Sequence, residues 1–228
     1  IIKHHYRLGS IITTVDAVNG LKQMKRHAES VKQVSVADRI VISKTDIAEA
    51  GDIERLRAKL ERLNPSAELI EAVNGDVDVK RLLRADIYDA RTKGAEVRRW
   101  LAAEEKNDSE HPHSHDVNRH DEHIRTFTLT FDEALDWTAF GIWLTMLLHA
   151  HGEKVLRVKG ILNVKGVEAP VIINGVQHVV HPPMHLKAWP DGDRRSRIVF
   201  IVDDIEQDLI ERSLAAFNAA AAADAAAA

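Results

Sequence analysis

The residue types and spacing in Ser43-Lys44-Thr45-Asp46 are suited to recognising a guanine base. A carboxylate at Asp46 can accept hydrogen bonds from guanine N1–H and N2–H together, whereas adenine presents an acceptor and a C–H at the same positions. Lys44, two residues earlier, can lay its methylene stem over the flat base. The spacing therefore predicts that Lys44 and Asp46 bind guanine beside Ser43. The alternative is a solvated strand-to-helix loop in which Asp46 caps the next helix.

The elements around this motif are predicted to form a parallel sheet. Ser43 ends a short apolar run, RIVIS at 39–43, and ligands in open α/β sheets bind at the carboxyl ends of such strands. Strands are also expected at 9–17 and 67–73, with helices at 21–36, 52–63 and 79–87, and strands that alternate with helices indicate parallel pairing. Asp16, near the end of the first strand, either faces a nucleotide or Mg²⁺ site or only closes the strand.

Beyond residue 123 the pattern changes to consecutive strands, which indicates an antiparallel sheet with helices packed on it. Either Asp132 or Asp136 is expected to cap a helix with an apolar face. Arg157 and Lys159 share one face of their strand, either as a basic patch for a partner or as a solvated face. Strands are predicted at 126–131, 155–164, 171–180 and 197–202, and a closing helix at 204–218. The alanine-rich tail either lengthens this helix or is itself disordered.

Histidines alternate in the polar segment between these two halves. His111, His113 and His115 form an H-x-H-x-H pattern, and neutral imidazole is a preferred ligand of divalent transition metals. Such a site would be of low affinity because binding must order the segment. The alternative is a solvated linker without a metal role. The predicted organisation is an α/β domain at 1–92, a His-rich linker at 93–123, an α+β domain at 124–218 and an alanine-rich tail at 219–228.

Composition limits the other function classes. The formal net charge of −4 gives no electrostatic reason to expect nucleic acid or an anionic membrane as partner. Cysteine is absent, which excludes a thiolate metal site in this chain and leaves His, Asp and Glu as ligands. No apolar run reaches the roughly 20 residues that span a bilayer.

Segments along nearly the whole chain resemble the CobW family of GTPases and metallochaperones. The first half looks like the latter half of the family's GTPase domain, and the second half looks like its C-terminal domain. The residues that carry the resemblance are Val15-Asp16-Ala17, 37–46 (ADRIVISKTD), 64–67 (NPSA), 74–78 (NGDVD), 140–148 (FGIWLTMLL), 156–162 (LRVKGIL), 174–177 (NGVQ), Trp189-Pro190 and 197–201 (RIVFI).

This resemblance implies a partial P-loop-GTPase-like α/β domain, without its N-terminal half, followed by an α+β domain. It implies GTP and Mg²⁺ as ligands of the intact protein, Zn²⁺ or Co²⁺ on the His-rich linker, and a metalloprotein client or cofactor-insertion partner in the cytoplasm, with a homo-oligomer left open. The rival hypothesis is a non-catalytic protein-interaction module with a degenerate nucleotide site.

The chain departs from the family pattern in three places. It contains no glycine-rich phosphate loop of the form G-x-x-x-x-G-K-S/T and no C-x-C-C metal motif, and the family more often has Asn where Ser43 stands. Without a phosphate loop there are no backbone N–H groups to cradle phosphates and no hydroxyl for Mg²⁺. We therefore expect the chain to be the C-terminal two-thirds of such a GTPase and not to hydrolyse GTP by itself.

Overall fold

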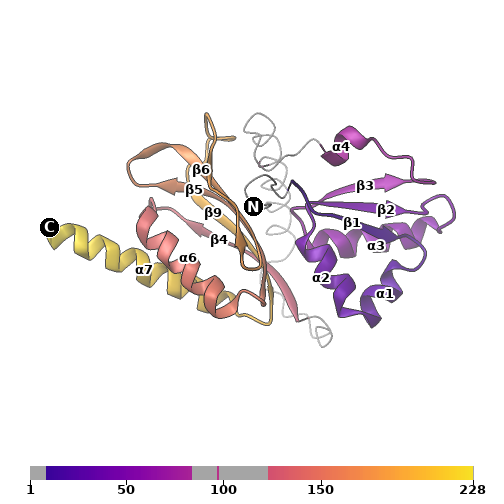
Figure 1. Cartoon of the computed structure of the whole chain (residues 1–228), viewed down its shortest axis with the longest axis horizontal. Coiled ribbons are helices and arrows are strands. Elements are labelled where there is room, and N and C mark those ends of the chain that lie inside the picture. Colours follow the sequence, from indigo (N-terminus) through magenta and orange to yellow (C-terminus); the bar gives the residue numbers. More distant parts are fainter. Residues whose placement is uncertain (1–8, 84–96, 98–122, 228) are drawn as a thin grey trace, which may run out of the picture. The chain divides into compact units, whose positions relative to one another are not determined.

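The computed structural model describes residues 9–83, 97 and 123–227. The chain divides into two compact units, Ile1–Pro112 and His113–Ala228, each with its own sheet (Figure 1). A parallel sheet in the first unit and an antiparallel sheet with helices in the second confirm the predicted fold class. The positions of the predicted domain bounds stay predictions.

The sheet of the first unit has the order β1-β2-β3, and all its strands are parallel. The central strand β2 is buried from Arg39 to Ile42, which explains the apolar residues at 40–42. The described elements are β1 (Ile12–Asp16), α1 (Gly20–Arg26), α2 (Ala28–Val36), β2 (Arg39–Ser43), α3 (Ala50–Leu63), β3 (Glu68–Ala72) and α4 (Val79–Leu83).

The first crossover contains two helices, so the prediction of one helix at 21–36 is wrong. His27 takes an extended conformation (φ −130°, ψ 105°) between α1 and α2. Its N–H closes α1 on the carbonyl of Gln23 at 2.8 Å, and its own carbonyl accepts from Ser30 N–H at 3.0 Å to start α2. No glycine or proline marks this break, which is why the sequence pattern continues through it.

Gly20 brings the start of α1 close to the strand before it. A Cβ at this position would lie 2.6 Å from Val15 Cγ1 and 3.3 Å from Leu56 Cδ1. Only a residue without a side chain allows this approach. The turn between Asp16 and α1 is thereby held against β1 and α3.

In the second unit, α6 and α7 cover one face of an antiparallel sheet of order β4-β9-β5-β6-β7, with β8 also paired to β6 (Figure 1). Asp136 caps α6 by accepting from Ala139 N–H at 2.9 Å, as one of the two predicted alternatives requires. The elements are β4 (Ile124–Phe131), α6 (Trp137–His151), β5 (Val155–Val164), β6 (Val167–Val176), β7 (Val179–Val180), β8 (Met184–His185), β9 (Ser196–Asp203) and α7 (Gln207–Ala227).

Three details of this unit differ from the sequence-based expectations or decide between them. The run at 171–180 is two strands, because Gln177 takes a positive φ of 50° and turns the chain back so that Val179 pairs with Val176. The alanine-rich tail continues α7 as helix. Arg157 and Lys159 are 1% and 4% exposed, so both interpretations, a basic patch for a partner and a solvated strand face, are wrong. They lie on β5, which is flanked by β9 and β6.

Asn64 fixes the chain at the end of α3. Its side chain is fully buried, and its amide group donates to the carbonyls of Val34, Ser35 and Ala37 at 2.8, 3.1 and 2.9 Å. Its oxygen accepts from Ser66 Oγ at 2.8 Å. One amide thus bonds three backbone carbonyls at the end of α2 and in the connection to β2.

We predict that Asn64→Asp lowers the free energy of unfolding of the first unit by at least about 2 kcal/mol, because a buried carboxylate would face three carbonyls with no proton to donate. Urea denaturation followed by circular dichroism measures the loss, and hydrogen exchange assigns it to α2 and β2. Glu61→Gln, on the exposed side of α3, is the matched carboxyl–amide control and should change little. Equal stability of both variants would contradict the role of Asn64.

Candidate functional site

The predicted site lies where β1 and β2 end together. Asp16 is the register partner of Ser43, and Ala17 N–H donates to the Ser43 carbonyl at 2.9 Å, which carries the pairing one step beyond the strands. Because the strands are parallel, the turn that follows each of them leaves from the same edge of the sheet. Asp16 and Lys44 are therefore neighbours in space although they belong to different crossovers.

Lys44 is tied to this edge by an ion pair. Its Nζ lies 2.7 Å from Asp16 Oδ2, and its backbone takes a positive φ of 61° that non-glycine residues seldom adopt. The lysine side chain is 54% exposed, whereas that of Asp16 is 16% exposed. The ammonium is thus anchored while much of the stem stays open to solvent.

The other oxygen of Asp16 organises the turn after β1. Oδ1 accepts from Val18 N–H at 2.8 Å and from Asn19 N–H at 3.1 Å, and the Asn19 side-chain amide reaches Oδ2 at 3.4 Å. The hydrogen bond from Lys44, together with these donors, lowers the pKa of Asp16 to about 2. Asp16 therefore does more than close a strand: it is a charged anchor for Lys44.

Asp46 lies in the turn between β2 and α3, with its side chain exposed. It does not cap α3, because the residue at that position is Glu49, which itself makes no capping bond. Among the hydrogen bonds and ion pairs of the described residues none involves the Asp46 carboxylate, so its oxygens face solvent. A solvated carboxylate two residues beyond an anchored lysine can accept two donors from one edge of a planar ligand.

Ser43 points to the neighbouring strand. Its Oγ donates to the Val15 carbonyl at 3.4 Å, and the residue is half-buried. The hydroxyl thus links β2 to β1 at the level of the site. Its proximity to Lys44 follows from the sequence, and any contact with a ligand stays a prediction.

Two family models match this chain. The CobW/HypB/UreG nucleotide-binding domain matches residues 1–71, which contain the Asp16, Lys44 and Asp46 edge, and the cobalamin synthesis protein cobW C-terminal domain matches residues 124–218. The chain belongs to the CobW family. The resemblance seen in the sequence is thereby confirmed for both units.

Curated relatives include the zinc chaperone YjiA of Escherichia coli, 27% identical over 215 residues, and the zinc-regulated GTPase metalloprotein activator 1 of Schizosaccharomyces pombe, 27% identical over 202 residues. A crystal structure of zinc-bound YjiA GTPase matches 95% of this chain with a TM-score of 0.70 at 25% identity. The alignment with YjiA covers 94% of this CobW-family chain but only 63% of YjiA. The alignment with the second relative covers 78% of this chain and 48% of that relative.

The structure does not test the predicted metal ligands of this CobW-family chain. His111, His113 and His115 lie outside the described residues. Within the described ranges, no group of three or more His, Asp or Glu side chains is placed to hold a metal ion. In the same ranges, no helix is both long and apolar enough to cross a membrane.

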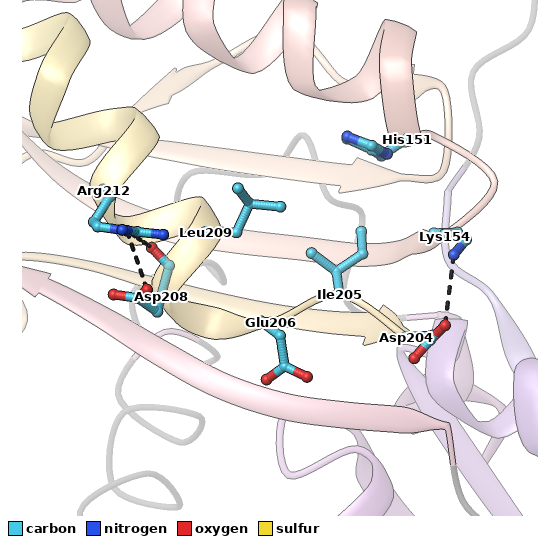
Figure 2. A pocket seen from close by; sticks show the side chains of 8 residues that line it. All are labelled: His151, Lys154, Asp204, Ile205, Glu206, Asp208, Leu209 and Arg212. Atoms are coloured by element: carbon cyan, nitrogen blue, oxygen red, sulfur yellow. Dashed lines mark hydrogen bonds and ion pairs between the residues drawn. The ribbon is translucent and has the colours of Figure 1, made fainter.

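The second unit carries a hollow of about 370 Å³ where α6, β5, β9 and α7 meet (Figure 2). Lys154 Nζ lies 3.7 Å from Asp204 Oδ2, and Arg212 Nε lies 3.0 Å from Asp208 Oδ2. Glu206, the remaining carboxylate of the lining, pairs with Arg125. Each acid already has a cation, so this hollow does not offer a cluster of unpaired carboxylates for a metal. Its lining residues are His151, Lys154, Asp204, Ile205, Glu206, Asp208, Leu209 and Arg212.

The pairing of Asp16 with Lys44 is the part of the site that the sequence reasoning missed. Asp16 ends β1 and Lys44 directly follows β2, and these parallel strands are neighbours in the sheet. The contact depends on the register between the two strands, which neither segment specifies alone.

We predict that Lys44→Met raises the pKa of Asp16 towards its usual value, because the strongest donor to the charged carboxylate is lost. A carbon-detected NMR titration of the Asp16 carboxyl measures this shift. Lys25→Met, on the exposed side of α1, is the control and should leave the pKa at about 2.

The same pair sets a pH dependence of stability. Since the folded pKa of Asp16 is depressed to about 2, the pair's contribution is complete above the unfolded value of about 4 and is lost as pH falls through the folded value. The stability difference between the wild type and Lys44→Met should therefore be constant from neutral pH to about 5 and shrink below that. A difference independent of pH down to about 2 would contradict the ion pair.

Proposed function

We propose that this chain is the guanine-reading and client-binding part of a GTP-dependent metallochaperone or metal-cofactor insertase. The observation that carries the proposal is the exposed Asp46 carboxylate, without a partner among the described residues, two positions after a lysine that is anchored at the carboxyl edge of a parallel sheet. In this proposal Asp46 accepts from guanine N1–H and N2–H, and the Lys44 stem covers the face of the base.

The family and the relatives support GTP and zinc as the small partners. One matching model is a nucleotide-binding domain, and the relatives bear the names zinc chaperone and zinc-regulated GTPase metalloprotein activator. Zn²⁺ is the cargo in this proposal, with Co²⁺ as the second candidate, and His111, His113 and His115 are the residues that would capture it. Mg²⁺ would accompany the nucleotide phosphates of the intact protein.

The phosphate side of nucleotide binding is not supplied by any motif of the 228 residues, which lack G-x-x-x-x-G-K-S/T. Base contacts alone bring no group to the reacting phosphate. We therefore propose that the chain by itself binds guanine weakly and does not hydrolyse GTP. In this proposal hydrolysis requires a phosphate loop that these 228 residues lack, and the chain contributes the base specificity.

The second unit is proposed to engage the protein partner. Its family model is the C-terminal domain of CobW proteins, and a relative is named for activating a metalloprotein. A metalloprotein client and a cytoplasmic location complete the proposal. A non-catalytic interaction module is the outcome that remains if the chain does not distinguish guanine from adenine.

We predict that Asp46→Ala abolishes the preference for GMP over AMP and weakens GMP binding by about 10- to 100-fold, because two hydrogen bonds to a charged acceptor are lost. NMR titration measures both affinities for the 228-residue chain and for the longest polypeptide that its gene encodes. Glu49→Ala, which removes the exposed carboxylate before α3, is the control and should retain the preference. Equal binding of GMP and AMP by the wild type would reject base recognition.

We predict that replacing His111, His113 and His115 together by alanine removes most of the Zn²⁺ binding seen by calorimetry, because the imidazoles of the alternating pattern are lost. The matched control replaces the exposed histidines His149, His151 and His185 of the second unit and should leave the isotherm unchanged. If the first variant binds Zn²⁺ like the wild type, the His-rich segment is not the capture site.

A further inference from the structure

A lysine that covers a base must hold its stem in one direction. A free lysine side chain samples many rotamers, and binding has to immobilise it. In this chain the far end of Lys44 is already fixed, since Nζ lies 2.7 Å from Asp16 Oδ2 while 54% of the side chain stays exposed. The cost of orienting the stem is therefore met before a ligand arrives.

The backbone of Lys44 has a conformation that its neighbours must hold in place. A φ of 61° is unfavourable for a residue with a Cβ and persists only where surrounding contacts determine it. The described contacts that hold this point are the Ala17–Ser43 backbone bond, the Ile47 N–H to Lys44 carbonyl bond of 3.3 Å, and the ion pair to Asp16. The first two fix the backbone, and only the third fixes the side chain.

The two oxygens of Asp16 do different work. Oδ1 accepts the backbone N–H groups of Val18 and Asn19 and shapes the turn into α1, whereas Oδ2 takes the Lys44 ammonium and, at the longer distance of 3.4 Å, the Asn19 amide. An asparagine at position 16 would keep an acceptor for the turn but lose the charge that holds Lys44. The two roles can thus be separated by a single substitution.

We propose that Asp16 is the positioning residue of the guanine site: it acts through Lys44, fixing the lysine stem in the direction in which it covers the base. The inference rests on the proposed base recognition by Lys44 and Asp46. Asp16 does not touch the ligand in this arrangement, because its carboxylate is already occupied by Lys44 and by the turn. Its effect is on affinity for the base, because a lysine stem covers the face of guanine and of adenine alike, and the choice between the two bases stays with Asp46.

The test compares Asp16→Asn with Asp16→Ala in the 228-residue chain, titrated with GMP and with AMP and followed by NMR. Both variants should weaken GMP binding by up to about fivefold, the upper end for an exposed ion pair, and weaken AMP binding by the same factor. Asp52→Asn, which breaks the exposed pair with Arg55 on α3, is the control and should leave both affinities unchanged. If only Asp16→Ala loses affinity, Asp16 is a turn cap and the inference is wrong.

A double-mutant cycle tests the route through Lys44. Lys44→Met should reduce the affinity for GMP at least as much as Asp16→Asn, and the double variant should lose no more affinity than Lys44→Met alone, because Asp16 acts only through the lysine. Additive losses would show that Asp16 acts by another route and would overturn the inference while base recognition stands. If the wild type itself binds GMP and AMP equally, the proposed function fails, and this inference fails with it.

Discussion

The parallel pairing of β1 with β2 is the constraint on which the site depends. In the observed register Asp16 lies opposite Ser43, so the turns after both strands leave from one edge. In an antiparallel arrangement of the same two segments, Asp16 would lie opposite the start of β2, near Arg39, and Lys44 would be at the far end. The ion pair, the exposed Asp46 and the anchored lysine stem all follow from strand direction.

The elements beneath the site are buried and hydrogen-bonded, whereas Asp46 itself is exposed. β2 is buried along nearly its whole length, and Asn64 ties the end of α3 to the segment that leads into this strand. Asp46 lies in the exposed turn after β2, where water solvates its carboxylate. A ligand must therefore replace water with well-directed donors, and only a ligand with two donors on one edge repays that exchange fully.

Elements that local patterns determine were predictable from the sequence, whereas contacts between distant segments were not. The apolar run at 39–43 indicated a buried strand, and the sequence offered Asp132 or Asp136 as the cap of an apolar helix, of which the structure has Asp136. The break at His27 carries no local signal, since its extended backbone is held by hydrogen bonds with Gln23 and Ser30 and not by a helix-breaking residue type. Arg157 and Lys159 alternate with apolar residues like a solvated face, yet they are buried on a strand with neighbours on both sides. The bond between Asp16 and Lys44 required the register.

The energetic scale of base reading decides what this edge can contribute. Two charge-assisted hydrogen bonds are worth about 3 to 6 kcal/mol at most, and binding must first offset the loss of translational and rotational freedom. Since a millimolar complex already requires about 4 kcal/mol net, Lys44 and Asp46 cannot provide tight nucleotide binding. They can provide discrimination, because an adenine base would leave the Asp46 carboxylate desolvated and unpaired. Under the proposed function, this CobW-family chain determines which nucleotide is accepted, and the phosphate contacts determine how tightly it is held.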